Sequence, residues 1–510
     1  MATKREGKGD GTDGGRLDRR SFLRIGAAGL VVAGGSAAVA VLAGRGREAG
    51  GPGPQVDGVE FSRTPMRQFR LRAAPLEWDV GTGHASPAWG YEGRVPGPEI
   101  RVREGERVRI VLENGLPEPT TIHWHGLPVP HAMDGVPELT QEAVPPGGTF
   151  VYEFVAGPAG TYWYHSHAPY QLDRGLFGPL VVEPGREPLD YDREQILVFD
   201  DWLLDPDHPR PDPNAAGGMM GMMEGMGGMR GMMRGGAETH VEGVRAQPLY
   251  DAFTVNGVLG TEHAPIEVRR GERLRLRLIN ASASHVVPVR VAGHRLTITH
   301  SDGRPVEPFT ADTVLLGMGE RYDVLVQMTN PGTWALESLN AAQRAAGLRV
   351  PIRYAGARGS ATGVSETGLV ARYSDLRGLE GTESRRPDRV YDLELSGGMM
   401  RGPTVWTING RRYPDTEPLE VVEGERVRVR LFNMSMMPHP MHLHGHFFDV
   451  VAPDGRPAGR PIRKDTVVLD HMQTHVIEFT ADNPGPRWFF HCHNIYHQHG
   501  GMATEVRYRT

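Results

Sequence analysis

The 510-residue chain contains a single cysteine, Cys492. One cysteine excludes an intrachain disulfide framework and cysteine-rich zinc modules. Aromatic residues are also sparse, at 7%, and the 62 acidic side chains outnumber the 56 basic ones. A slightly acidic chain lacks the basic surface that polyanions need, so no nucleic-acid partner is expected.

Long apolar runs are missing as well. The one candidate is the uncharged, Gly-rich stretch Ile25 to Leu42, which follows Asp18-Arg19-Arg20-Ser21-Phe22-Leu23-Arg24. A membrane span is one interpretation, but the stretch is short for one and only mildly apolar. Paired arginines before such a stretch are typical of a twin-arginine signal. We therefore predict a signal and linker over 1–54, recognition by the twin-arginine export machinery, and a periplasmic or other extracytoplasmic location.

Glycine and proline, by contrast, are plentiful, with 67 and 41 residues, and favour turn-rich β structure. Ile100–Asn114 recurs as Ile266–Asn280 and again as Leu419–Asn433, each time as a Gly-Glu turn followed by alternating apolar residues. This alternation indicates half-buried strands, and three copies indicate three related sandwich modules. The predicted first, middle and third modules span 55–185, 190–356 and 388–510, with a linker at 357–387.

Paired histidines mark the outer modules. Nine residues after the last Asn of the repeat, the first and third modules each carry His-x-His, and each carries a second pair further on. The middle module has no histidine at either position, so we expect it to be a spacer without metal ligands. The four pairs are His123 and His125, His165 and His167, His442 and His444, and His491 and His493.

These pairs predict a metal cluster. On a strand, His-x-His places both rings on one face, roughly 7 Å apart. A single pair could be an ordinary strand feature satisfied by hydrogen bonds, but four pairs in register between modules argue against that explanation. Eight imidazoles exceed the needs of one tetrahedral ion, so several metal ions are expected.

Cys492 stands between two of these histidines. His497 and Met502 follow it closely, and His439 lies at the other end of the module. A thiolate, two imidazoles and a distant thioether form the ligand set of a blue-copper site. An inert buried cysteine is the alternative, which the neighbouring ligands disfavour. An electron that arrives at Cys492 could then pass along the backbone to the cluster.

Four motifs carry a family resemblance: His-Trp-His-Gly, Tyr-His-Ser-His, His-Pro-Met-His-Leu-His-Gly-His and His-Cys-His-x3-His-x4-Met. They resemble the copper motifs of the multicopper oxidases, specifically the three-domain bacterial laccases and the cuprous oxidases of the copper-resistance type. The resemblance implies an all-β chain of three cupredoxin-like Greek-key β-sandwich domains that binds four coppers. It implies type 1 copper ligands at His439, Cys492, His497 and Met502. It implies type 2 ligands at His123 and His442, and type 3 ligands at His125, His165, His167, His444, His491 and His493.

The resemblance also implies an activity. Such enzymes take four single electrons from a donor at the type 1 copper and reduce O2 to two waters at the cluster. Cu(I), phenolic compounds or both are the expected donors. An exported copper-binding or storage protein is the alternative, but the chain retains every ligand of the oxidase, which argues against that role.

Oxygen reduction consumes protons, so a carboxylate beside the cluster is expected as a relay. Asp134 lies eleven residues past His123, where similar enzymes carry an acid near the type 2 copper. A turn residue before Gly135 is the alternative. Many relatives have a Glu directly after the last histidine ligand, whereas this chain has Gln498, which cannot donate a proton.

A Gly- and Met-rich tract occupies residues 217–236. Its composition is typical of a flexible surface loop, but thioethers are soft ligands that select Cu(I), so we predict that the tract captures that ion. A second group of methionines, around His439, either extends a soft path to the type 1 site or packs in the core. The tract contains Met219, Met220, Met222, Met223, Met226, Met229, Met232 and Met233, and the second group is Met434, Met436, Met437 and Met441.

Overall fold

The structure is a computed structural model that describes residues 66–208, 210–211, 245–358, 368–380, 386–398, 402–456 and 459–509. The predicted signal at 1–54 and the Met-rich tract lie outside the described residues. Among the described residues the regular structure is almost entirely β, with only two short α-helices, α2 (Ala341–Ala345) and α3 (Ile495–His499). The predicted all-β class is confirmed.

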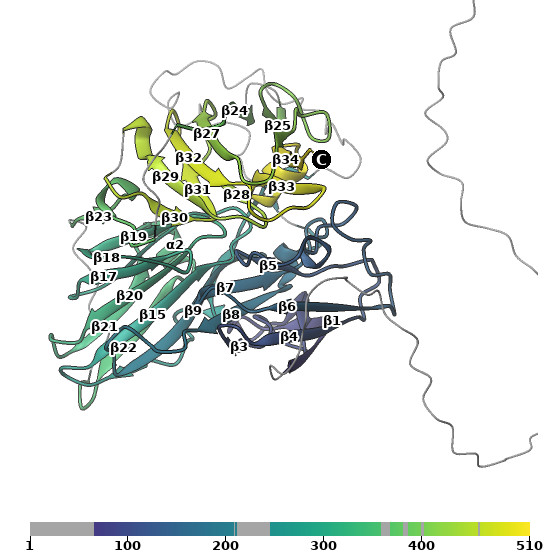
Figure 1. Cartoon of the computed structure of the whole chain (residues 1–510). Coiled ribbons are helices and arrows are strands. Elements are labelled where there is room, and N and C mark those ends of the chain that lie inside the picture. Colours follow the sequence, from purple (N-terminus) through teal and green to yellow (C-terminus); the bar gives the residue numbers. More distant parts are fainter. Residues whose placement is uncertain are drawn as a thin grey trace, which may run out of the picture. The chain divides into compact units, whose positions relative to one another are not determined.

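The first module contains two four-stranded sheets, drawn in purple and blue in Figure 1. The first sheet has the order β2 (Ser86–Tyr91), β1 (Met66–Trp78), β4 (Arg107–Asn114), β6 (Thr149–Val155). The second has the order β3 (Ile100–Arg103), β8 (Phe177–Glu183), β7 (Gly160–His165), β5 (His123–His125). The short 3-10 helices η1 (His131–Met133) and η2 (Leu172–Arg174) lie in its loops.

The middle module, in teal, has a seven-stranded and a six-stranded sheet. The seven-stranded sheet has the order β13 (Val258–Leu259), β12 (Ala252–Val255), β9 (Arg193–Trp202), β15 (Arg273–Asn280), β20 (Arg321–Gln327), β17 (Leu296–Ser301), β18 (Arg304–Ala311). The six-stranded sheet has the order β14 (Ile266–Val268), β22 (Arg349–Tyr354), β21 (Thr333–Ser338), β16 (Val287–Val291), β19 (Thr313–Leu316), β23 (Val370–Ala371). Part of the predicted linker is therefore structured, since β23 joins this sheet and is followed by η3 (Tyr373–Asp375). A separate two-stranded ribbon pairs β10 (Arg210–Pro211) with β11 (Pro248–Leu249).

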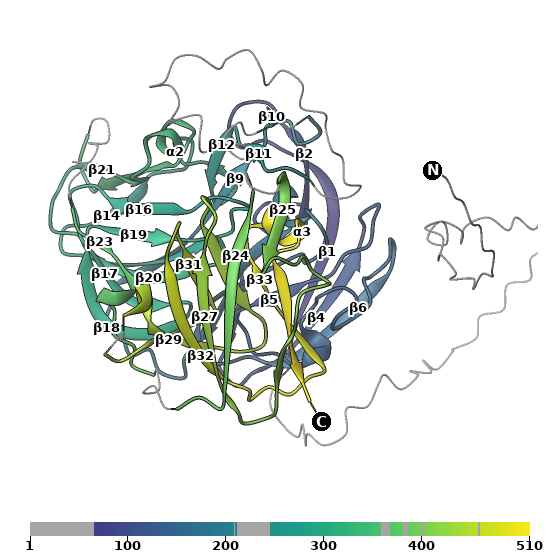
Figure 2. The same ribbon diagram turned by 90° about the horizontal axis from the view of Figure 1, so that it is seen from above.

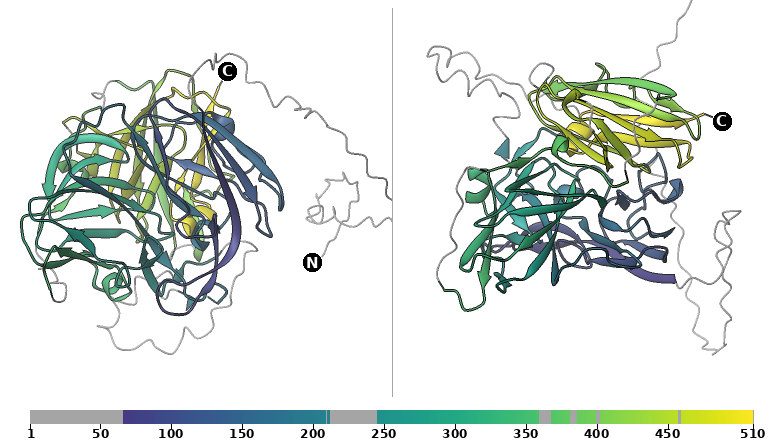
Figure 3. Two further views of the ribbon diagram at one scale, coloured as in Figure 1. Left: turned by 90° about the horizontal axis from the view of Figure 1, so that it is seen from below. Right: turned by 60° about the vertical axis from the view of Figure 1, so that its left-hand side comes forward.

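The third module, in green and yellow, has a six-stranded and a five-stranded sheet, and Figure 3 shows it from two further sides. The larger sheet has the order β25 (Gly402–Ile408), β24 (Arg389–Gly398), β27 (Arg426–Asn433), β32 (Thr474–Thr480), β29 (Phe448–Ala452), β30 (Ile462–Lys464). The smaller has the order β26 (Leu419–Val421), β34 (Ala503–Tyr508), β33 (Arg487–Cys492), β28 (His439–Leu443), β31 (Thr466–Leu469). Helix α3 lies beside β25 (Figure 2), and η4 (Pro453–Gly455) follows β29.

The sequence repeat forms the same strand–turn–strand unit in each module. Gly105, Gly271 and Gly424 adopt φ of +82°, +87° and +83°, a left-handed conformation that glycine tolerates without steric cost. The strand that follows the turn alternates as predicted: in β4 every second residue is buried and the others are half-buried. The buried face packs against the opposite sheet of the same module, which supplies the hydrophobic driving force for each sandwich.

The Asn that ends each repeat makes equivalent hydrogen bonds in all three modules. The side-chain oxygen of Asn433 accepts from the backbone N–H of Ser435, and its amide donates to the carbonyls of Met437 and Leu469. Asn114 and Asn280 bond to the matching positions of their own modules. Each Asn therefore fixes the turn that leads into the strand on which the histidine pairs of the outer modules lie.

Candidate metal centres

The histidine pairs lie on, or just past the ends of, neighbouring strands of one sheet in each outer module. In the first module, β5 pairs with β7 so that His123 is opposite His165. In the third, β28 pairs with β33 so that His442 is opposite His491. Strand pairing thus brings residues that are far apart in sequence to adjacent positions, and all eight cluster histidines are buried.

The two modules face each other across these strands. Within the four pairs, in chain order, ring centres are 5.8, 6.0, 4.8 and 5.7 Å apart. Between the modules, His123 stacks on His444 at 3.9 Å and His125 on His442 at 3.8 Å. The structure therefore brings all eight predicted histidines together in one place.

The ring nitrogens fall into groups that would each suit one ion. Within each group of three residues, the ligand atoms, one from each residue, all lie within 4.8 Å of one another. A pair formed by His123 and His442 has its Nε2 atoms 3.4 Å apart. The two remaining groups are His125 with His165 and His493, and His167 with His444 and His491.

These residues fit a metal cluster chemically. The Nδ1 atoms of His123, His165, His442 and His491 each contact a backbone carbonyl, at 2.8 to 3.0 Å. A proton held there leaves the Nε2 lone pair free for a metal. Burial holds the pKa of His165 and His167 well below the ordinary value, so the rings are neutral.

Several buried ring nitrogens have no hydrogen-bonding partner among the described residues, an arrangement that costs free energy unless another ligand binds them. A soft or borderline cation such as copper would satisfy the donor set. These nitrogens are Nδ1 of His125, Nε2 of His165, Nε2 of His167, both nitrogens of His493, and Nε2 of His497.

Cys492 forms a second centre with His439 and His497. Its Sγ is 3.6 Å from Nδ1 of each ring, and the two Nδ1 atoms are 3.0 Å apart. Met502 is buried beside them: its N–H donates to the carbonyl of His497, and its own carbonyl accepts from the N–H of Cys492. Trp406 covers the ring of His497 with centres 3.7 Å apart. The four predicted residues are therefore neighbours, on β28, β33, α3 and the turn that follows α3.

Burial determines the protonation of Cys492 and His439 in this centre. Burial raises the pKa of the Cys492 thiol and lowers the pKa of His439 to about 3. The thiol therefore stays protonated until a cation displaces the proton, while the imidazole is available as a neutral ligand.

A short covalent and hydrogen-bonded route joins the two centres. Cys492 is bonded in the chain to His491 and His493, which belong to different ligand groups of the cluster. Nδ1 of His491 also contacts the carbonyl of Cys492 at 3.0 Å. The geometry thus contains the direct link that the sequence predicts.

Asp134 is buried beside the cluster. Its Oδ2 is 2.9 Å from Nδ1 of His444, and its Oδ1 is 3.3 Å from Nδ1 of His123. Gly135 does adopt a turn conformation, φ +85°, so Asp134 lies before a turn, and its role as a relay stays a prediction. The turn is what delivers the carboxylate to the histidines.

Gln498, which stands where many relatives have a Glu, also lies beside the cluster. Gln498 and His499 line a small cavity together with three cluster histidines, His165, His167 and His493. Burial lowers the pKa of His499 to about 4, so this ring is neutral at neutral pH. No carboxylate is among the described residues that line the cavity.

The middle module contributes none of the predicted ligands, but it contacts the cluster. A Cβ placed on Gly319 would lie 2.9 Å from Cε1 of His125, so this loop packs directly on a cluster ring. Arg321, on β20, forms two hydrogen bonds to Asp465, which contacts His125 and His442. Sequence reasoning missed Asp465, although the run of three charged residues Arg463-Lys464-Asp465, just before the apolar strand β31, was a visible signal.

The methionines around His439 divide into two kinds. Met441 is fully buried in the core, which supports the packing explanation for that residue. Met434 and Met436 are 45% and 56% exposed, and Met472, on a neighbouring turn, is 58% exposed. These exposed thioethers lie on turns that adjoin Ser435, whose hydroxyl is 2.6 Å from Nε2 of His439.

Comparisons with known proteins agree with this geometry. Sequence models of the multicopper oxidase family match residues 73–187, 230–352 and 386–510. The chain is 34% identical to the multicopper oxidase MmcO of Mycobacterium tuberculosis over 98% of this chain and 99% of that protein. It is 28% identical to a copper resistance protein A homolog of Pseudomonas syringae pv. tomato, over 96% and 99% of the two chains.

A solved multicopper oxidase from Pseudomonas thermotolerans superposes with a TM-score of 0.67 at 29% identity, covering 88% of this chain and all of that one. The chain belongs to the multicopper oxidase family, whose members are copper-dependent oxidoreductases. The predicted family, enzyme class, copper cofactor and cupredoxin-like fold are confirmed. Among the described residues, no helix is both long and apolar enough to cross a membrane.

Proposed function

We propose that this chain is a four-copper oxidase that withdraws single electrons from small donors at Cys492 and reduces O2 to water between the outer modules. The observation that carries the proposal is the convergence of eight buried histidines beside a buried Cys-His-His group. Two of these histidines, His491 and His493, are the chain neighbours of Cys492. Bound copper would supply the one-electron chemistry. The protein supplies the ligands, the link between the sites and the protons.

The proposed ligands follow the nitrogen groups. Three ions would bind in the cluster, one to His123 and His442 and one to each of the two triads, and a fourth would bind at Cys492. Met502 would offer its thioether to the fourth ion. The full set is His123, His125, His165, His167, His439, His442, His444, His491, Cys492, His493, His497 and Met502.

The chain's own groups then have distinct tasks. Cys492 would hold the electron-accepting copper, and one peptide unit on each side links it to the cluster ligands His491 and His493. Asp134 is the proposed proton donor, because its buried carboxylate lies between two cluster histidines, 2.9 Å from Nδ1 of His444 and 3.3 Å from Nδ1 of His123. Gln498 can orient a hydrogen-bonded group in the cavity but cannot supply a proton.

Cu(I) is the donor that the surface favours. Met434 and Met436 flank Ser435, whose hydroxyl is 2.6 Å from Nε2 of His439. His471 is held against the same loop, with its Nδ1 2.7 Å from the carbonyl of Ser435. Exposed thioethers and an imidazole beside the entry histidine suit a soft monovalent ion. The similarity to copper resistance proteins agrees with this choice, and the laccases among the relatives keep phenols as the second candidate.

The test compares two donors in two variants. Replacing Met434, Met436 and Met472 together by Leu retains apolar volume but removes the thioethers, and deleting 218–234 removes most of the Met-rich tract. We expect O2 uptake with Cu(I) to fall at least tenfold in one or both variants, with oxidation of a bulky phenol unchanged. Equal rates on Cu(I) in both variants and the wild type would favour a general laccase. Copper bound far beyond four ions per chain without O2 uptake would favour storage.

We further propose that the protein works outside the cytoplasm after export by the twin-arginine route. The support is the Arg19-Arg20 motif ahead of the uncharged stretch. Fractionation of cells that express the chain, with Arg19 and Arg20 both changed to Lys as the comparison, tests this. Export of the Lys variant at the wild-type level would count against the route.

A further inference from the structure

A second buried carboxylate, Asp465, has the same relation to the cluster as Asp134. Asp134 lies in the first module, and its backbone carbonyl accepts from Nδ1 of His123, 2.8 Å away in the same module. Asp465 lies between β30 and β31 in the third module, and its carbonyl accepts from Nδ1 of His442 at 2.9 Å. Each Asp thus fixes, through its backbone, the proposed type 2 ligand of its own module.

The two side chains reach in opposite directions across the interface. Oδ2 of Asp134 is 2.9 Å from Nδ1 of His444 in the third module. Oδ1 of Asp465 is 3.2 Å from Nε2 of His125 in the first module. The two aspartates therefore form a pseudo-symmetric pair that connects the modules through their histidines.

Their surroundings differ in one decisive way. The guanidinium of Arg321 donates two hydrogen bonds to Asp465, from Nη1 to Oδ1 at 2.7 Å and from Nη2 to Oδ2 at 2.6 Å. Among the described residues, Asp134 pairs with His123 and His444 but with no arginine or lysine. Asp465 is therefore held in place by a two-bond guanidinium pair that Asp134 lacks.

Arg321 contacts all three modules. It belongs to the middle module, and it is fully buried. Besides the pair with Asp465 in the third module, its Nε donates to the carbonyl of Thr161 in the first module at 3.1 Å. A planar guanidinium with several fixed donors suits this bridging role, which the single ammonium of lysine cannot reproduce.

The contact to Asp465 also decides how His125 faces the cluster. Nε2 of His125 is occupied by Asp465 and by the hydroxyl of Thr466, 3.2 Å away. Its Nδ1 is left without a partner among the described residues, next to His165 and His493. If the ring turned over, Nδ1 would face the anion and Nε2 the cluster at a different reach.

We propose that Asp465 and Arg321 are positioning residues through which the middle module assembles the copper cluster. Arg321 holds Asp465, and Asp465 then orients His125 and anchors His442, so that two histidines from different modules present their lone pairs to the same site. Groups of this kind, which touch metal ligands but not the metal, typically affect metal affinity 10- to 100-fold. The inference rests on the proposed function, because it concerns the same cluster.

The experiment measures copper binding and spectra rather than turnover. Arg321→Met keeps much of the side-chain volume but removes the guanidinium and its two hydrogen bonds to Asp465. Arg321→Lys keeps the positive charge without the two parallel donors. Asp465→Asn removes only the negative charge of the acid. Each protein is loaded with Cu(II), and the readouts are copper per chain, the EPR signal of the proposed type 2 copper and the visible band of the Cys492 site.

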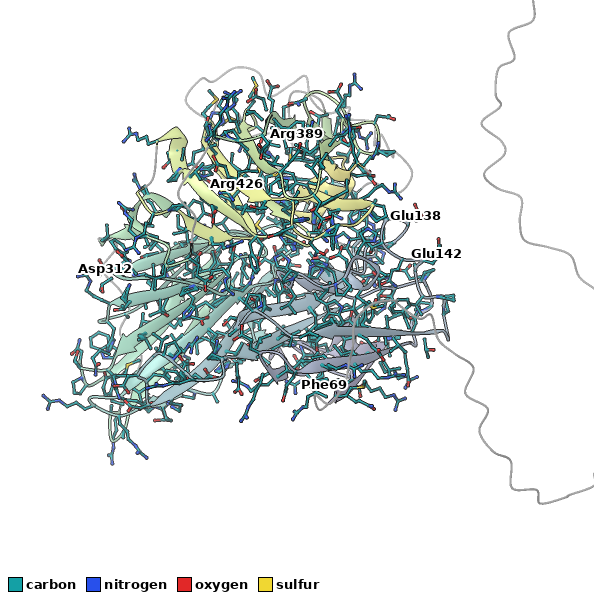
Figure 4. The ribbon with its side chains drawn as sticks, in the orientation of Figure 1. Phe69, Glu138, Glu142, Asp312, Arg389 and Arg426 are labelled. Atoms are coloured by element: carbon teal, nitrogen blue, oxygen red, sulfur yellow. The ribbon has the colours of Figure 1, made fainter. Side chains whose placement is uncertain are left out.

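The matched control is Arg426→Met. Arg426, labelled in Figure 4, is buried in the third module and pairs with Asp449 and Glu478, at 2.7 and 3.1 Å, without contacting a cluster histidine. Its loss removes a comparable buried ion pair. It therefore reports what general destabilisation alone does to copper binding.

We expect Arg321→Met and Asp465→Asn to bind cluster copper at least tenfold more weakly and to shift the EPR signal. Arg321→Lys should fall between them and wild type, and the Cys492 band should persist in all. Four coppers and an unchanged EPR signal in folded Asp465→Asn would overturn the inference, as would losses equal to those of Arg426→Met. Should Arg321→Met not fold, Arg321→Lys and Asp465→Asn decide the matter. A wild-type chain without cluster copper would instead refute the proposed function.

Discussion

At the scale of single residues, Cys492 combines the roles of ligand and electron entry. Its sulfur is equidistant from the two Nδ1 atoms that share its site, and its backbone neighbours belong to the cluster. We therefore expect Cys492→Ser to lose the visible band and essentially all turnover while it retains the cluster copper. Absorption spectra, copper content and O2 uptake measure this. Substrate oxidation at the wild-type rate would refute the assignment.

Asp134 is expected to matter for oxygen reduction and not for electron entry. Asp134→Asn keeps the shape and the backbone contact to His123 but removes the acid, and general acid catalysis contributes typically about 10²- to 10⁴-fold. Stopped-flow mixing should show rapid reduction by the donor, followed by reoxidation with O2 slowed by about that factor. If reoxidation kept its wild-type rate, Asp134 would be a turn residue only.

Asp173 gives a pH dependence of stability. It accepts hydrogen bonds from Tyr250 and Tyr496, at 2.8 and 2.6 Å, yet burial and the nearby charge of Asp201 raise its pKa from 3.8 to about 7. Between these values the folded protein binds more protons at Asp173 than the unfolded chain does. Stability from this group is therefore fully present below about pH 4 and is lost as the pH rises to about 7.

We expect the Asp173→Asn variant to lack this decline. Its Tm relative to wild type should rise between pH 4 and pH 7 and stay level above, because only the wild type loses a favourable proton there. Thermal unfolding of both proteins across this range is the measurement. Parallel Tm profiles over the whole range would show that Asp173 does not titrate as described.

At the scale of strands and turns, the repeat-ending Asn offers a matched pair. Asn280 and Asn433 make the same three hydrogen bonds, but only the turn of Asn433 leads through Ser435 to His439. Alanine at either position should lower stability by about 1–3 kcal/mol or more, since buried backbone groups lose their partners. Only Asn433→Ala should also alter the visible band of the Cys492 site. Equal spectra in the two variants would contradict this link.

The same elements show why much of the fold and site could be predicted from sequence. Period-two alternation after Gly105, Gly271 and Gly424 depends on local sterics and burial, which a sequence displays directly. The histidine pairs were equally visible, because the spacing of two residues along β5 or β28 is itself the geometry that places both rings on one face.

What the sequence did not reveal depends on docking between elements. Arg321 and Asp465 are 144 positions apart and lie in different modules. Neither residue stands out in its local sequence, apart from the charged run Arg463-Lys464-Asp465. The cluster of Asp173, Tyr250 and Tyr496 likewise draws one residue from each module, so no spacing rule within a repeat could have found it.

At the scale of the whole molecule, the modules meet around the site that they jointly form. A shared apolar cluster includes Trp163 from the first module, Trp202 from the middle one and Ile495 from the third. Burying such side chains stabilises the junction by roughly 1.5–3 kcal/mol each. The apolar junction and the bridging Arg321 therefore give the middle module a structural part in a site to which it contributes no proposed ligand.

Copper should in turn hold the outer modules together. Four of the eight cluster histidines come from each outer module, so ions bound between them stabilise the docked arrangement by mass action, by about 2.7 kcal/mol when free copper is 100 times its dissociation constant. Removing copper with a chelator should lower the Tm and speed hydrogen exchange in β5, β7, β28 and β33. Exchange in β18, at the edge of a middle-module sheet, should change little. Cys492→Ser, which is expected to keep the cluster copper, should lose the same protection on chelation, because the stabilisation comes from the cluster and not from the Cys492 site. If chelation left the Tm and the exchange of these four strands unchanged, copper would bind to modules that are already fully docked.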